Sequence, residues 1–350
     1  MADSYPVVSV VIPIRNEARY IERCLKAVLT QDYPPERLEI LVVDGMSDDN
    51  TREIVKPLFS SQRNLQSAIA VPRERSNLQL LDNPERIVPT ALNRGIRAAR
   101  GAVIVRIDGH TIIEPDYVSQ CVRALQETNA DNVGGPMRAV SETFLGNAIA
   151  LATSSPFGVG GARFHYAETA QWVDTVYMGA YPRAVFDRIG LFDEELVRNQ
   201  DDEFNFRLTQ AGGKIWLDPQ IKSIYFSRGT LRGLWKQYYE YGFWKVRVIQ
   251  KHGRPASLRH LVPALFVLAL LGSALLSIVT QTPLWFLLIA VPYALAAFAA
   301  SVIAARGNWR ALVLLPIVFL TLHLSYGIGF LVGLARWNLA SPARQSSPQL

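Results

Sequence analysis

The cluster Asp108-Gly109-His110 places an imidazole two residues after a carboxylate, directly behind the apolar run AVIVRI at residues 102–107. Such a pair can hold Mg²⁺ or Mn²⁺, and the imidazole favours Mn²⁺. A bound ion would neutralise a diphosphate. The alternative is an Asx turn followed by a surface histidine.

Asp44 ends the apolar run EILVV at residues 39–43 and begins a loop that also contains Asp48. An aspartate at a strand end can accept hydrogen bonds from a uracil ring N–H or from a ribose hydroxyl. The same two residues could instead form only a turn and a helix cap. The local sequence leaves both interpretations open.

A third cluster, NQDDEFNFR at residues 199–207, leads into a predicted helix over residues 204–210 that Gly212-Gly213 ends. A carboxylate at this helix start could act as a general base that faces the metal site. Acidic side chains are also favoured near a helix N-terminus by the helix dipole, so capping is the alternative.

The elements that must position these clusters alternate between strand and helix. Continuous β-branched runs predict strands, and apolar residues at helical spacing predict the helices between them. The expected strands are 6–14, 39–43, 66–71 and 102–107, and the expected helices are 20–29, 50–59 and 87–100. Such alternation predicts a doubly wound parallel sheet, whose ligands bind beyond the carboxyl ends of its strands.

Several classes of protein are excluded. The chain lacks G-x-G-x-x-G after its first strand and lacks G-x-x-x-x-G-K-[ST], which argues against dinucleotide binding and P-loop chemistry. Only Cys24 and Cys121 are present, so a disulfide scaffold or a cysteine-rich zinc site is ruled out. All 30 acidic residues lie at or before Glu240, so the first part is net acidic and does not suit nucleic acid.

Three successive runs near the C-terminal end contain no charged residue: residues 261–280, 283–305 and 311–335. Each has about the 20 residues that a helix needs to cross a bilayer. Trp285, Trp309 and Trp337 lie near the ends of the runs, where interfacial aromatics are found. We expect a three-helix transmembrane region, and a helical hairpin buried in a soluble core is the alternative.

Basic residues in the short flanks predict the orientation of these helices. Lys251, Arg254 and Arg259 precede the first run. The link between the first and second runs is uncharged, and the link between the second and third contains Arg306 and Arg310, so the two basic flanks fall on the same side. Residues 1–258 are therefore expected in the cytoplasm, at a plasma (inner) membrane. We expect residues 259–336 to form the multi-pass region and 337–350 a tail, with no signal peptide at the N-terminus.

The motifs, taken in order, resemble the inverting glycosyltransferases of family 2, which have the GT-A fold. The resemblance covers about residues 6–250 and is carried by VSVVIPIRNEARYIERCLKAVLTQDYP, VVDGMSDDNT, ALNRGIRAARGAVIVRIDGHT and NQDDEFNFRL. Residues 154–168 and 173–196, with the three apolar runs, look most like succinoglycan-type glucosyltransferases. The resemblance implies a Rossmann-like, mostly parallel α/β sheet with helices on both faces.

The resemblance also implies a role for particular residues. The nucleotide sugar would be bound by Pro13, Arg15, Glu17, Asp44 and Asp108, and the metal ion by Asp108 and His110. Asp201 would be the catalytic base, and Gly179, Arg183 and Gln237 would line the acceptor side. The implied cofactor is Mn²⁺ or Mg²⁺, and the implied partners are a UDP-sugar, a lipid-linked sugar acceptor and the membrane, without nucleic acid.

Three positions depart from the family pattern. His110 replaces the second aspartate of D-x-D, Gln200 replaces the glutamate of E-D, and residues 237–241 lack the Arg and Trp of Q-x-x-R-W. The last departure favours addition of a single sugar over processive synthesis.

The resemblance implies transfer of glucose from UDP-glucose to a polyprenyl-diphosphate-linked sugar in exopolysaccharide biosynthesis. Direct transfer to polyprenyl phosphate is one alternative. The other is a membrane scaffold with a catalytically decayed domain, which the departure at Gln200 motivates.

Overall fold

The computed structural model describes residues 5–59, 77–227 and 229–339, and the chain divides into two compact units. The first contains residues 1–140 and 162–227, and the second contains 141–161 and 228–350. Hydropathy alone led us to expect a boundary at residue 258. By packing, however, the segments 141–161 and 228–258 group with the apolar helices.

The first unit is built on an eight-stranded sheet in the order β3-β2-β1-β4-β9-β6-β10-β8. Its strands are β1 (Val8–Ile14), β2 (Leu38–Asp44), β3 (Leu78–Asp82), β4 (Val103–Arg106), β6 (Asn132–Gly134), β8 (Gln171–Val173), β9 (Ala180–Pro182) and β10 (Ile215–Leu217). β1 to β4 pair in parallel, as do β6 and β10, whereas β8 and β9 run antiparallel to their neighbours. The predicted mostly parallel α/β sheet is confirmed.

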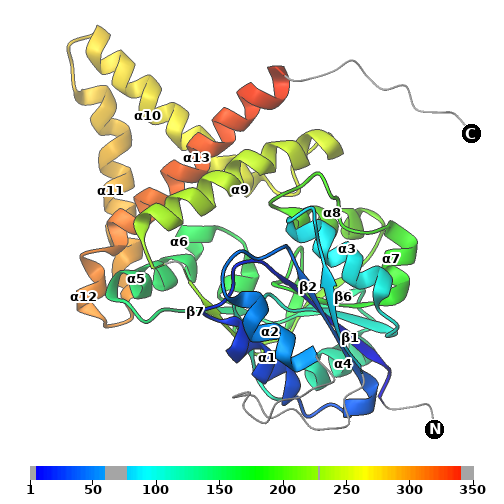
Figure 1. Ribbon diagram of the computed structural model, residues 1–350. Helices are drawn as coiled ribbons and strands as arrows, with labels where there is room; N and C mark the ends of the chain where they lie inside the picture. Colours follow the sequence, from blue (N-terminus) through cyan, green and yellow to red (C-terminus); the bar gives the residue numbers. More distant parts are fainter. Residues whose placement is uncertain (1–4, 60–76, 228, 340–350) are drawn as a thin grey trace, which may run out of the picture. The chain divides into compact units, whose positions relative to one another are not determined.

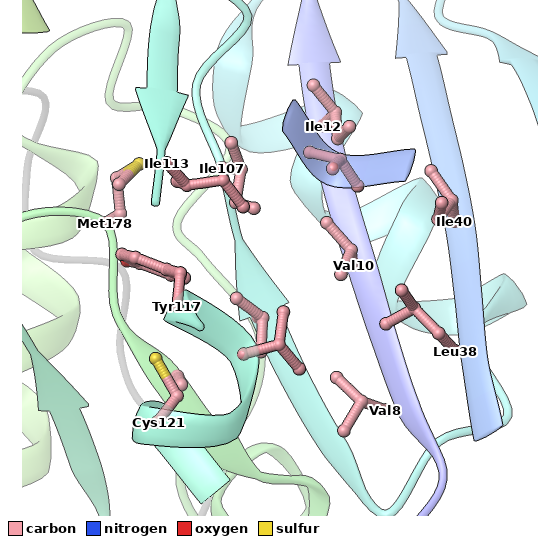
Figure 2. Packing of buried hydrophobic residues seen from close by; sticks show 14 of the residues in the cluster. Val8, Val10, Ile12, Leu38, Ile40, Ile107, Ile113, Tyr117, Cys121 and Met178 are labelled. Atoms are coloured by element: carbon pink, nitrogen blue, oxygen red, sulfur yellow. The ribbon is translucent and has the colours of Figure 1, made fainter. Parts of the chain in front are cut away.

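Helices cover both faces of this sheet (Figure 1). One face packs against α1 (Ile21–Leu29), α2 (Thr51–Phe59) and α4 (Tyr117–Thr128), and the other against α3 (Val88–Ala98), α7 (Arg183–Ile189) and α8 (Gln200–Gln210). Side chains of a strand point alternately to the two faces, so Val10 and Ile12 face the α1 side with Ile40 (Figure 2), whereas Val11 faces α3. Both faces of β1 are therefore buried, which explains its continuous apolar run.

The predicted elements match the structure unevenly. The expected strands 6–14, 39–43 and 102–107 correspond to β1, β2 and β4. The expected strand at 66–71 lies outside the described residues, and a strand that the sequence analysis did not predict, β3, pairs with β2 instead. The helix expected over 204–210 begins earlier, at Gln200.

A smaller three-stranded sheet also belongs to the first unit. Its strands are β5 (Thr111–Ile113), β11 (Ser223–Phe226) and β7 (Met137–Val140), with β11 in the centre. β5 begins immediately after His110 and pairs with β11, so the ring of Tyr225 lies 5.4 Å from that of His110. This sheet therefore fixes the chain that leaves the Asp108–His110 turn.

The second unit is entirely helical in its described part. Its helices are α5 (Phe144–Thr153), α6 (Pro156–Val159), α9 (Leu231–His252), α10 (Val262–Val279), α11 (Leu284–Ala305), α12 (Trp309–Leu312) and α13 (Leu315–Leu339). Three helical segments, 258–279, 284–305 and 315–337, are long and apolar enough to cross a membrane. α9 packs along α13 so closely that a Cβ on Gly242 would lie 2.1 Å from the Tyr326 carbonyl oxygen.

Candidate active site

Asp44 lies at the carboxyl end of β2, with its side chain fully buried. It accepts hydrogen bonds from the Ser47 hydroxyl, at 2.5 Å, and from Nη1 of Arg52, at 2.6 Å. Nη2 of Arg52 reaches Asp82 at the end of β3, at 2.7 Å. One arginine thus links the carboxyl ends of two neighbouring strands, and the Asp44 carboxylate is held in place before any ligand arrives.

The Asp108–His110 turn follows β4 at the same edge of the sheet. A Cβ added to Gly109 would lie 2.8 Å from Ile14 Cγ2 and 3.3 Å from Glu17 Cγ, so the turn packs tightly against the end of β1. His110 Nδ1 lies 2.9 Å from Glu17 Oε1. An ionised carboxylate only accepts hydrogen bonds, so Nδ1 donates, and Nε2 is the ring atom with the lone pair for a metal.

Two residues of this turn suit a metal ion that also binds substrate. In the described part of the chain, no group of three or more His, Cys, Asp or Glu side chains could hold a metal. Asp108 and His110 therefore offer one carboxylate and one imidazole, a mixture that suits Mn²⁺. An ion held by these two residues would need further ligands from water or from a substrate, as is usual for ions that act with phosphates.

Asp201 is in the first turn of α8, two residues after the N-cap residue Asn199, whose backbone is left-handed with a φ of 62°. Its side chain is 38% exposed and accepts a hydrogen bond from the Asp202 amide at 2.9 Å. Glu203 instead is buried and pairs with Arg207 at 3.0 Å. Glu203 is thus held in an ion pair, whereas Asp201 and Asp202 are both partly exposed.

Sequence reasoning missed Arg106, the last residue of β4. Its side chain is only 7% exposed; Nε donates to Asp108 Oδ1 at 2.9 Å, and Nη1 lies 3.8 Å from Asp201 Oδ2. Burial by itself would lower the pKa of Arg106, but the charges of Asp108 and Asp201 outweigh it and raise that pKa. The signal was available, because an arginine inside an apolar strand needs a buried partner.

The other predicted residues are distributed unevenly. Pro13 pairs with Val43 inside the sheet, and Arg15 donates to the Arg86 carbonyl oxygen at 3.3 Å, both at the carboxyl edge. Gly179 has a φ of 101°, and its carbonyl oxygen accepts a hydrogen bond from the Arg106 backbone amide at 3.0 Å. A Cβ there would lie 2.6 Å from the Tyr181 hydroxyl, so only glycine fits beside this arginine.

Arg183 lies away from this edge of the first unit, and Gln237 belongs to the second unit. Arg183 donates to the carbonyl oxygens of Ala99 and Gly101, at the amino end of β4, so its predicted acceptor-side role gains no support. Gln237 belongs to α9 in the second unit, where it donates to the Tyr241 hydroxyl at 2.9 Å.

Left-handed backbone is concentrated in the loops at the carboxyl edge. Five non-glycine residues of the first unit have positive φ there: Asn16, Met46, Arg86, Met178 and Asn199. Such conformations cost free energy and persist where the surroundings impose them, often at functional sites. Asn16 shows how they are held, because its backbone amide donates to the Ser47 hydroxyl at 3.0 Å and its side-chain Nδ2 donates to Asp48 Oδ1 at 2.7 Å.

In doubly wound sheets, ligands bind beyond the carboxyl ends of the strands, where these acidic residues are gathered. Residues 9–190 match the model of the family Glycosyl transferase family 2, and the chain belongs to that family. It is therefore a glycosyltransferase with a GT-A-like fold, as the resemblance implied.

Two relatives and one solved structure agree with this assignment. The chain is 29% identical to "Succinoglycan biosynthesis protein ExoA" of Rhizobium meliloti, over 92% of this chain and 93% of the relative. It is 31% identical to the Methanococcus voltae dolichyl N-acetyl-alpha-D-glucosaminyl phosphate 3-beta-D-2,3-diacetamido-2,3-dideoxy-beta-D-glucuronosyltransferase, over 70% and 74%. The mannosyltransferase PcManGT of Pyrobaculum calidifontis, solved with GDP-Man and Mn²⁺, has the same fold, with TM-score 0.57, 22% identity and coverage of 94% and 87%.

Proposed function

We propose that the chain is a membrane-anchored, metal-dependent, inverting glycosyltransferase that moves glucose from UDP-glucose to a polyprenyl-diphosphate-linked sugar in exopolysaccharide biosynthesis. The observation that carries the proposal is the gathering of Asp44, Asp108, His110 and Asp201 at one edge of one sheet. The name of the Rhizobium meliloti relative supports the pathway, and that of the Methanococcus voltae relative supports a lipid-linked acceptor.

The donor would bind across the ends of β1, β2 and β4. Asp44 would accept a hydrogen bond from uracil or ribose, and Pro13 and Arg15 would border the same pocket. Because Arg52 already donates to Asp44, a bound nucleotide must share this carboxylate or displace the arginine toward Asp82.

Asp108 and His110 would hold the metal ion, with Glu17 fixing the imidazole through Nδ1. The bound ion would supply Lewis-acid stabilisation of the departing UDP. Support for a divalent cation comes from the fold neighbour that was solved with Mn²⁺. The mixed donor set at the turn suits the same ion.

Asp201 would remove the proton from the acceptor hydroxyl as that oxygen attacks the anomeric carbon. A single displacement breaks the bond to the UDP oxygen and inverts the anomeric centre. Partial exposure of Asp201 suits contact with an acceptor, whereas the neighbouring Glu203 is already paired with Arg207.

The apolar helices would serve as an anchor, with residues 1–258 in the cytoplasm. A lipid-linked acceptor is confined to the bilayer, so tethering the enzyme there raises the effective concentration of the two partners. Three helices of sufficient length and hydropathy, in the described part of the chain, support the anchor.

The test is a donor screen on membranes that contain the chain, with lipid extracts as acceptors and mass spectrometry of the products. We expect a hexose to be added to a diphosphate-linked sugar lipid with release of UDP. A product in which the hexose is attached directly to polyprenyl phosphate would replace the proposed acceptor. Absence of UDP release with every donor would favour a decayed scaffold.

A further inference from the structure

Arg106 is the one buried cation that contacts both sides of the proposed site among the described residues. Its guanidinium donates to Asp108 through Nε at 2.9 Å, whereas Asp201 lies 3.8 Å from Nη1, beyond hydrogen-bond distance. Nη1 is buried and has no hydrogen-bond partner. A buried donor without a partner costs free energy, so a small movement of the guanidinium that gives Nη1 a hydrogen-bond acceptor would be favourable.

The backbone around Arg106 restricts such a shift to the side chain. The Arg106 amide donates to the Gly179 carbonyl oxygen, and β4 is held between β1 and β9. Asp108 is two residues away along the chain, whereas Asp201 comes from α8, far away in sequence. The guanidinium can therefore exchange one carboxylate for the other without any movement of the sheet.

We propose that Arg106 is a positioning residue that transfers its hydrogen bonding from Asp108 to Asp201 when a divalent cation takes Asp108. This inference rests on the proposed function. A divalent cation is a stronger partner for Asp108 than a guanidinium, so its arrival weakens the Nε bond. Nη1 then closes the gap to Asp201 and orients it.

Two consequences follow for the reaction. Arg106 competes with the metal for Asp108, so the empty site is kept partly neutralised at the cost of metal affinity. Asp201 is fully oriented only after the metal has bound. The base therefore becomes ordered in response to the metal, although the two carboxylates lie on different elements.

The test measures metal affinity and turnover on the purified full chain in detergent. Mn²⁺ binding is followed by electron paramagnetic resonance without any substrate, for wild type and Arg106→Gln. We expect Arg106→Gln to bind Mn²⁺ about 3- to 10-fold more tightly, because the competing charged donor is gone. Its kcat should fall about 10- to 100-fold, because Asp201 loses its orientation.

The opposite signs distinguish this role from a merely structural one. Damage to the fold would weaken Mn²⁺ binding together with turnover, and weaker or unchanged Mn²⁺ binding overturns the proposal. The matched control is Arg100→Gln, because Arg100 also pairs with a buried carboxylate, Glu39, but at the other end of the sheet. Mn²⁺ affinity and kcat of this control should equal those of wild type.

A double-mutant cycle tests the link to Asp201 directly. In an Asp201→Asn background, Arg106→Gln should lower kcat no further, and independent, multiplicative losses overturn the proposal. If Arg106→Gln does not fold, Arg106→Lys carries the test, and an unchanged kcat in that variant overturns it. Asp108→Asn should abolish Mn²⁺ binding; unchanged Mn²⁺ affinity would show that the cation does not take Asp108, and would overturn both the proposed metal site and this role of Arg106.

Discussion

At the scale of single residues, the side chains of the site hold one another in place before any substrate binds. Asp44 is fixed by Ser47 and Arg52, and His110 by Glu17. Glu17 is itself anchored, because its amide donates to the Thr51 hydroxyl at 2.8 Å. Such prior fixation lowers the entropy that donor binding must otherwise remove.

Asp201→Asn keeps the shape of the side chain but removes its ability to accept a proton. We expect kcat to fall by at least about 100-fold with little change in donor KM, because a positioned base contributes about 10² to 10⁴ in rate. Steady-state assays of UDP release measure both constants. Asp202→Asn is the matched neighbour and should cost far less; a dead Asp202→Asn beside an active Asp201→Asn would identify the wrong base.

Glu17→Ala removes the partner that orients the His110 imidazole. We expect Mn²⁺ affinity to fall about 10- to 100-fold, as is typical when the hydrogen-bond partner of a metal ligand is lost. Calorimetric titration with Mn²⁺ measures this, and Glu17→Gln should retain more affinity because its amide oxygen can still accept. If Glu17→Ala instead weakens UDP binding in the presence of EDTA, Glu17 belongs to the nucleotide pocket, as the family resemblance implied.

At the scale of elements, the two ends of the sheet differ in what their polar residues do. The carboxyl ends of β1, β2 and β4 carry the candidate site, and Glu39 of β2 ties the amino ends together. This buried carboxylate accepts hydrogen bonds from the Ser9 hydroxyl at 2.5 Å and from the Arg100 amide and Nε at 2.8 Å each. One side chain thus joins β1 and β2 to the loop that precedes β4, at the end of the sheet opposite the candidate site.

Glu39→Gln should therefore destabilise the fold in a pH-dependent way. Burial raises the pKa of Glu39, but the hydrogen bonds from Ser9 and Arg100 outweigh it, so the pKa in the folded state is lowered. A lowered folded pKa gives stability that is present above the unfolded pKa and lost as pH falls through the folded value. Thermal unfolding should show wild type more stable at pH 7, with the difference shrinking toward acidic pH; a constant difference would contradict the prediction.

The parts of the fold that were predictable are those whose signal is local. β1 and β2 are buried on both faces and read as continuous apolar runs, so their ends, and therefore Asp44, could be predicted. β3 is only half-buried, and β9 and β10 have three residues each, too short for a periodic pattern. The contact between Arg106 and Asp201 depends on pairing across long sequence separations, which spacing along the chain does not reveal.

At the scale of the whole molecule, the chain joins a catalytic unit to a helical unit whose long helices suit a bilayer. The candidate spans α10 and α11 are joined by a short link at residues 280–283, and α11 and α13 by a link that contains Arg306 and Arg310. Because basic links are retained in the cytoplasm, the uncharged link and the basic link are expected to lie on opposite sides of the membrane. The orientation is thus testable on the intact chain.

Cysteine labelling of intact cells tests this topology without truncation. The native Cys24 and Cys121 are buried, and burial raises the pKa of both thiols, so wild type should remain unlabelled by a membrane-impermeant maleimide. Thr282→Cys, in the uncharged link, should label from outside. Asn308→Cys, in the basic link, should label only after permeabilisation; both residues are exposed, so access to reagent differs only by side. Labelling of both from the same side would mean that α11 does not cross the bilayer, and the reversed pattern would place the catalytic unit outside, away from any cytoplasmic UDP-sugar.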